Sequence, residues 1–158
     1  MSTNVKKNAS EPTGPSVQKY PSILKVGFFA VAASIIANLI VRTIAFAVWD
    51  LPTDFPPLQP VAIAAFTLGG TFLATWVYAF IRKRAKKPES LFRWIALVTL
   101  IVSIIPNFLL MSNPTLTPFP GGSSTTFGVL ILFHVVAALV SVSILTSLGR
   151  PGTSEEVK

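Results

Sequence analysis

The length, composition and charge of the chain exclude a soluble globule: its 158 residues are 51% hydrophobic and only 12% charged, which is too little polar surface for a protein in water. The formal net charge of +7 would suggest nucleic acid in a soluble protein, but here the basic residues cluster at the ends of apolar stretches, where anionic lipid is the simpler partner. Because the chain has no cysteine, a disulfide framework, a thiol redox pair and a thiolate metal site are also excluded.

The chain begins with a polar tail that leads into a long apolar segment. Residues 1–22 contain Ser, Thr, Asn, Lys and three prolines with almost no apolar periodicity, so we expect a disordered tail. The apolar segment, at about 24–48, is long enough to cross the ~30 Å hydrocarbon layer at ~1.5 Å per residue. The small residues at 30–34 are similar to a signal-peptide cleavage site, but the apolar run continues far beyond them. We therefore expect a membrane span rather than a cleaved leader.

A proline-rich connector and a second apolar segment come next. The connector, residues 49–60, holds four prolines and two acids and no base, and its prolines end the preceding helix. The second span is predicted at about 61–81. Its central pair, Gly69 and Gly70, indicates a close-packing surface, with a hinge as the alternative. Aromatic residues near its end mark a membrane interface.

Two further spans are separated by an uncharged loop of Pro, Gly, Ser and Thr. The third span is predicted at about 91–111 and is interrupted late by Pro106, which indicates a kink rather than a gate. The fourth span is predicted at about 125–148, and a short cytoplasmic tail, 149–158, follows it. Residues 23–148 thus form one membrane domain, and the fold class is all-α, an integral membrane four-helix transmembrane bundle.

Basic residues predict the orientation of this bundle. Short loops rich in Lys and Arg stay in the cytoplasm during insertion, and the loop between the second and third spans is strongly basic, whereas the opposite loops carry only acids. Both termini are therefore predicted to be cytoplasmic. The same loop is predicted to contact anionic lipid through Arg82, Lys83, Arg84, Lys86 and Lys87.

Polar residues in the outer half of the spans form one candidate pocket. Asn38 and Arg42 are four residues apart and share a helix face, and the depth of His134 along its span is similar to that of Asn38. Because the first and last helices of an up-down bundle are neighbours, we expect Asn38 and His134 to meet directly or across one water. The complete set of candidates is Asn38, Arg42, Thr67, Thr71, Ser103, Asn107 and His134.

Each of these residues also has a structural interpretation. Asn, Ser and Thr most often form interhelical hydrogen bonds in membranes. Arg42 is either an interface anchor paired with Asp50 or Asp54, or the anion-binding group of a pocket. For His134 a structural and a functional role both remain open.

The order of these features resembles a family of small bacterial four-span membrane proteins known as a domain of unknown function. The resemblance is carried by Asn38, the loop residues Asp54–Leu58, Ser103 with Pro106, and the segment His134–Ala138. It covers about 24–148 and implies a bacterial membrane protein without implying an activity.

Absent residue types exclude several functions. Proton-coupled cation export needs a carboxylate within the membrane, and all six acids lie in tails or loops. A haem held by two imidazoles needs a second histidine, and no phosphate loop or nucleophile elbow is present. We therefore expect no catalytic, cofactor-binding or metal-binding residue and no nucleic-acid partner. The chain is predicted to be a non-enzymatic, multi-pass protein of the bacterial cytoplasmic membrane, an accessory or structural subunit with a protein partner or a second copy. The alternative is a small-solute binder or permease that uses Asn38, Arg42 and His134.

Overall fold

A computed structural model describes residues 22–149, and within this range the chain is helical without strands. Four helices are long and apolar enough to cross a membrane, so the chain is a multi-pass membrane protein. The predicted all-α fold class is confirmed. The predicted tails, 1–22 and 149–158, lie outside the described residues except for Ser22 and Gly149. The elements in order are α1 (Ile23–Val48), η1 (Pro56–Leu58), α2 (Pro60–Ile81), α3 (Pro88–Ser112), η2 (Pro114–Leu116) and α4 (Ser124–Leu148).

Local chemistry sets the ends of these helices. Pro60 and Pro88 occupy the first turns of α2 and α3, where the missing N–H is not needed and the fixed φ favours the helix. For this reason α3 begins about three residues earlier than predicted. Helix α4 begins with a capping box in which the Thr126 amide donates to Ser123 Oγ (3.2 Å) and the Ser123 amide donates to Thr126 Oγ1 (2.7 Å).

Pro106 does not end α3, which continues to Ser112. A proline inside a helix removes one backbone hydrogen bond. Next to it, Ser103 Oγ donates to the Leu100 carbonyl (2.8 Å) and Asn107 Nδ2 donates to the Ser103 carbonyl (3.4 Å). Side-chain hydrogen bonds to the α3 backbone thus accompany the proline.

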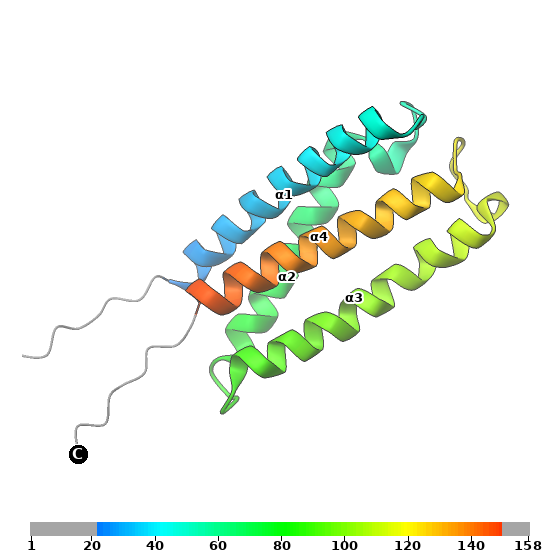
Figure 1. Cartoon of the computed structure of the whole chain (residues 1–158). Coiled ribbons are helices and arrows are strands. Elements are labelled where there is room, and N and C mark those ends of the chain that lie inside the picture. The colour runs from blue at the N-terminus through cyan, green and yellow to red at the C-terminus, as the bar shows by residue number, and fades with distance from the viewer. Residues whose placement is uncertain (1–21, 150–158) are drawn as a thin grey trace, which may run out of the picture.

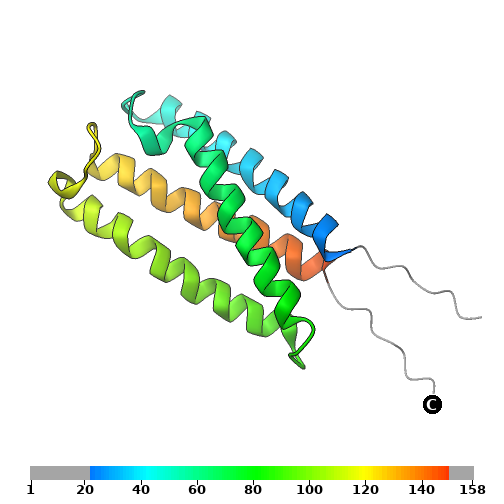
Figure 2. The same cartoon turned by 180° about the vertical axis from the view of Figure 1, so that it is seen from behind.

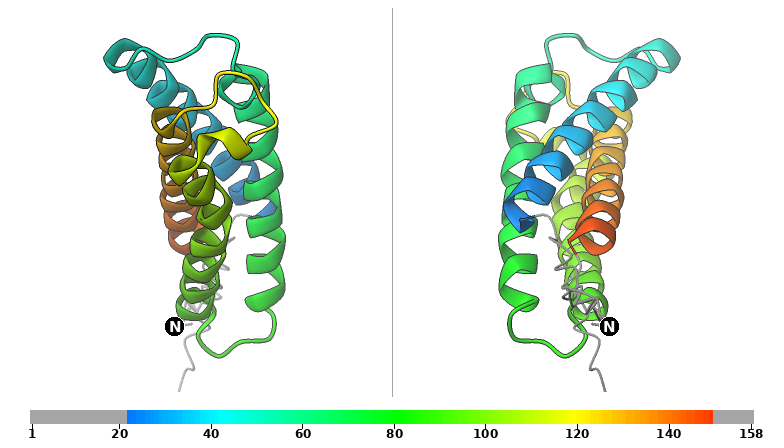
Figure 3. Two further views of the ribbon diagram at one scale, coloured as in Figure 1. Left: turned by 90° about the vertical axis from the view of Figure 1, so that its right-hand side faces the viewer. Right: turned by 90° about the vertical axis from the view of Figure 1, so that its left-hand side faces the viewer.

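Helix α4 occupies the centre of the bundle. It packs along α1 on one side and along α3 on the other, and α2 packs mainly on α1. Helix α2 crosses α4 from beside α3 at the basic loop to beside α1 at the far end, behind α4 in Figure 1 and in front of it in Figure 2. Both views in Figure 3 show the short connection between α2 and α3. The start of α1, the end of α4 and this connection all lie at one end of the bundle, called here the basic end (Figure 1).

The core has apolar clusters at its two ends. The cluster at the far end is centred on Phe55, whose ring meets Phe127 edge to face at 5.9 Å. The cluster at the basic end contains Tyr78 against Phe92, with ring centroids 4.8 Å apart. The far-end cluster comprises Ala45, Leu51, Phe55, Leu58, Ile63, Phe127, Val129 and Phe133, and the basic-end cluster comprises Val26, Ala30, Tyr78, Ile81, Phe92 and Leu145. Between the two clusters, buried polar side chains line the contact of α1 with α2.

Helices α1 and α2 approach closely at Gly27. A Cβ atom placed on Gly27 would overlap Thr75 Cγ2 and would lie only 2.9 Å from Thr75 Oγ1. Small residues at helix contacts allow this approach in membranes, where packing rather than water drives association. The close approach of the two helices at this point therefore depends on the missing side chain at Gly27.

We predict that Gly27→Ala lowers the thermal stability of the bundle in detergent, because the added methyl group forces α1 and α2 apart at a cost of about 1–3 kcal/mol. Thr75→Ala removes the overlapping atoms, so the double variant should recover most of the loss. Gly70→Ala is the matched control, because a Cβ there has no protein atom within 4 Å. Equal stability of Gly27→Ala and Gly70→Ala in a circular-dichroism melt would contradict the close contact.

Candidate functional site

A buried polar seam runs between α1 and α2 in the middle of the bundle. It consists of Ser34 and Asn38 from α1 and of Thr67, Thr71 and Thr75 from α2, and all five side chains are buried. Within each helix these residues are four positions apart, which places them on one face. The seam therefore results from two helices that turn their polar faces toward each other.

One hydrogen bond connects the helices across the seam. Asn38 Nδ2 donates to Thr67 Oγ1 at 2.9 Å, and Thr75 Oγ1 donates to the Thr71 carbonyl of its own helix at 2.8 Å. Two oxygen atoms of the seam, Asn38 Oδ1 and Ser34 Oγ, are buried without a hydrogen-bond partner. The hydrogen-bonding groups of the seam are thus only partly paired, and unpaired polar groups destabilise a low-dielectric interior.

The apolar clusters enclose this seam at both ends. Ile63 and Ala45 belong to the far-end cluster and lie beyond Thr67 and Asn38 along their helices. Asn38 is 1% exposed. The predicted pocket opening outward is therefore replaced by a closed polar contact between two helices.

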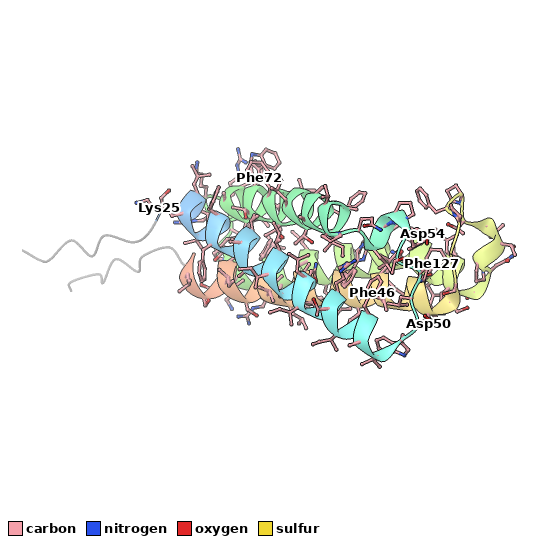
Figure 4. All side chains as sticks on the ribbon, turned by 90° about the horizontal axis from the view of Figure 1, so that it is seen from above. Lys25, Phe46, Asp50, Asp54, Phe72 and Phe127 are labelled. Atoms are coloured by element: carbon pink, nitrogen blue, oxygen red, sulfur yellow. The ribbon has the colours of Figure 1, made fainter. Side chains whose placement is uncertain are left out.

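Arg42 lies above the seam and binds backbone rather than an acid. Its Nε donates to the Leu58 carbonyl of η1 at 2.7 Å, and its guanidinium carbon lies 4.4 Å from the centre of the Phe46 ring. Among residues 22–149, Arg42 forms no ion pair with Asp50 or Asp54. Both acids lie at the same end as Phe46 (Figure 4). Arg42 thus anchors the connector through a carbonyl, a charge-assisted hydrogen bond that is stronger than a neutral one.

His134 and Asn38 form no direct hydrogen bond among the described residues, so the direct form of the predicted pairing is wrong. His134 Nδ1 donates to the Leu130 carbonyl at 2.7 Å, within α4. Asn38 instead turns to Thr67, because the polar face of α1 packs on α2. Ser103 and Asn107 bond to the backbone of α3. Of the seven predicted site residues, Asn38, Thr67 and Thr71 lie in the seam, whereas Arg42, Ser103, Asn107 and His134 form hydrogen bonds with backbone carbonyls.

Gly27 and Thr75 are partners in the contact of α1 with α2 that were not predicted from the sequence. A signal for Thr75 was present, because Thr67, Thr71 and Thr75 repeat every four residues. For Gly27 the sequence offered none, since its role depends on which residue faces it. The seam has hydroxyl and carboxamide groups only, so it can donate and accept hydrogen bonds but cannot supply a proton donor or base near neutral pH. Within the described range, no three His, Asp or Glu residues gather in a way that could hold a metal ion.

The basic loop lies at the same end of the bundle as the start of α1 and the end of α4 (Figure 1). Lys83, Arg84, Lys86 and Lys87 are exposed there, whereas Arg82 is half-buried. The guanidinium carbon of Arg84 lies 3.9 Å from the centre of the Phe80 ring, a cation–π contact. Lys25 lies at the same end, opposite to Asp50 and Asp54 (Figure 4). Most basic residues in the described range therefore lie at the basic end together with Glu89, whereas Asp50, Asp54 and Arg42 lie toward the far end.

We predict that Thr67→Val destabilises the bundle by at least ~0.6 kcal/mol, because it removes the acceptor of the Asn38 hydrogen bond while nearly preserving volume. Ser34→Ala is the matched variant one turn away. It removes a hydroxyl without a partner, so it should leave the free energy of unfolding unchanged or raise it. The free energy of unfolding of both variants is measured by titration with a denaturing detergent, followed by circular dichroism. A loss for Ser34→Ala as large as that for Thr67→Val would show that Ser34 has a bound partner in the membrane.

Comparison with known proteins gives a family without an assigned activity. A model described as a family of unknown function (DUF6069) matches residues 18–150, which is most of the chain and includes the whole bundle. No curated protein and no solved structure matches the chain. The chain belongs to the DUF6069 family of proteins of unknown function.

Proposed function

We propose that this protein is a non-enzymatic subunit of a membrane assembly, with an accessory or structural role, and that a partner helix packs on the outer face of α2. The buried polar groups support a structural role, because the seam is closed and lacks a titratable group. The observation that carries the proposal is the surface around Gly69 and Gly70.

Gly69 and Gly70 serve no packing purpose inside the bundle. A Cβ added at either residue would meet no protein atom within 4 Å, and the buried face of α2, which includes Thr67 and Thr71, points the other way. Glycine inside a helix is less favourable than alanine by ~0.5–1 kcal/mol. A close-packing partner helix would offset this cost, because glycines let two backbones approach within a membrane.

Large apolar side chains surround these glycines. Phe66 is 78% exposed and Phe72 is 61% exposed, and Phe72 lies on the outer edge of the bundle (Figure 4). A flat glycine surface with aromatic residues beside it suits the ridge of a second helix. The hinge interpretation of the two glycines finds less support, because α2 is one uninterrupted helix from Pro60 to Ile81.

A photo-crosslinking amino acid at Phe72 tests this proposal in intact membranes. We expect a discrete crosslinked band, and we expect Gly70→Leu to abolish it without lowering thermal stability, since the leucine clashes with the partner only. The matched control is the same label at Phe108, an exposed phenylalanine of α3. A band that persists in Gly70→Leu, or diffuse products at both positions, would argue that this face contacts lipid alone.

The alternative, a small-solute binder or permease, is favoured by one observation. Asn38 Oδ1 and Ser34 Oγ are buried acceptors without a partner, and such atoms suit a polar solute. The closed ends of the seam and the helix-internal bond of His134 count against it. The Ser34→Ala measurement described above separates the two functions, because a solute site would lose stability or binding.

The charge distribution supports an orientation with both termini in the cytoplasm of a bacterial cell. Reporters fused after residue 158 and within 82–87 should both show cytoplasmic activity, and a reporter within 114–122 should show the opposite location. Gly121, the only described residue with positive φ (82°), lies in that last loop, so an insertion next to it interrupts a turn and no helix. A reporter after residue 158 on the outer side would contradict the four-span orientation.

A further inference from the structure

A shallow hollow of about 310 Å³ lies on the outer surface of α3 near its first turns. Glu89, Ser90, Arg93, Trp94 and Leu97 line it, and their spacing places them on one face of the helix. Phe92, the buried residue of α3, packs into the basic-end cluster on the opposite side. The hollow therefore faces away from the bundle, at the level where α3 leaves the membrane.

The lining residues change in character along the helix axis. Glu89 is nearest the water, and Arg93 lies one turn deeper, about 6 Å at ~1.5 Å per residue. Trp94, which is 65% exposed, and Leu97, which is 45% exposed, continue toward the hydrocarbon region. An anion, a hydroxyl, a cation, an aromatic ring and an aliphatic side chain thus follow one another from the helix end inward.

The guanidinium of Arg93 has N–H donors that can bind a ligand in this hollow. Within the range 22–149 no hydrogen bond or ion pair involves Arg93, and a guanidinium presents five N–H donors in a planar fork that suits a phosphate. Glu89 is engaged in another interaction, but a carboxylate has about four lone-pair sites and can accept further hydrogen bonds. One cation and one anion therefore line the same surface, one helical turn apart.

We propose that this hollow binds the headgroup of a phospholipid that carries a phosphate and a primary ammonium, the phosphatidylethanolamine type. The phosphate lies at Arg93 and Ser90, the ammonium at Glu89, and an acyl chain runs along Leu97. The covalent order of the lipid, from acyl chain through phosphate to ammonium, is the order of these side chains along α3. A primary ammonium donates hydrogen bonds to a carboxylate, whereas the trimethylammonium of phosphatidylcholine has no N–H to donate.

Charge distinguishes this site from the basic loop beside it. A headgroup that carries only negative charge is attracted by Arg93 but repelled by the like charge of Glu89. The loop residues from Arg82 to Lys87 carry no acid among them and suit such lipids better. The proposal concerns the surface of α3 and does not depend on the partner proposed for α2.

Trp94 provides the measurement, because it lines the hollow and the chain has only three tryptophans. In a variant with Trp49→Phe and Trp76→Phe, lipids with brominated acyl chains quench Trp94 fluorescence on contact. Vesicles of phosphatidylcholine receive a fixed fraction of brominated phosphatidylethanolamine, phosphatidylcholine or phosphatidylglycerol. We expect phosphatidylethanolamine to be preferred over the other two by roughly threefold, in keeping with one exposed ion pair.

Two variants and one control make this result specific. Glu89→Gln should abolish the preference for phosphatidylethanolamine over phosphatidylcholine, and Arg93→Gln should weaken the quenching by both lipids. The control retains only Trp76, which is 62% exposed on α2 and lines no part of the hollow, and it should show no such preference. Helical content by circular dichroism confirms that the variants are folded.

Four outcomes would overturn the proposal. They are equal quenching by the ethanolamine and choline lipids, stronger quenching by phosphatidylglycerol, a preference that survives Glu89→Gln, and the same preference at Trp76.

Discussion

In the interior of a bilayer a buried polar side chain has no water to bind, and this constraint shapes the contact between α1 and α2. The two helices approach at Gly27, where no side chain separates them from Thr75, and they are joined by the hydrogen bond from Asn38 to Thr67. Both features require the polar faces of the helices to be turned inward. A rotation of either helix would expose Asn38 to lipid, so the contact specifies the orientation of α1 and α2 about their axes.

The apolar clusters at the two ends follow from this arrangement. With polar groups in the middle, the large apolar side chains of the core gather where the loops fold back, around Phe55 at one end and around Tyr78 and Phe92 at the other. Arg42 joins α1 to the connector by its bond to the Leu58 carbonyl. The interior is therefore closed at both ends, and the surfaces that remain for other molecules lie on the periphery.

Those peripheral surfaces are of two kinds. The outer face of α2 combines an open glycine pair with exposed aromatic side chains, which suits a helix that packs closely. The outer face of α3 begins with a hollow that has charges of both signs and continues as an apolar surface, which suits a lipid. Helix α4 occupies the centre between α1 and α3, so both peripheral helices can bind partners without disturbing the main contacts.

The number of helices, their approximate limits and the end at which the basic residues lie could be predicted from the sequence, because these depend on apolar run length, on prolines and on local charge. It also indicated the polar face of α1 through the spacing of Asn38 and Arg42. Which helix faces meet became clear only from the packing of the helices. Asn38 pairs with Thr67 rather than with His134 because α1 turns its polar side to α2, and the spacing of residues within one helix contains no information about the rotation of its neighbour. For the same reason the role of Gly27 against Thr75 and the open surface at Gly69 and Gly70 could not be assigned before the helices were placed.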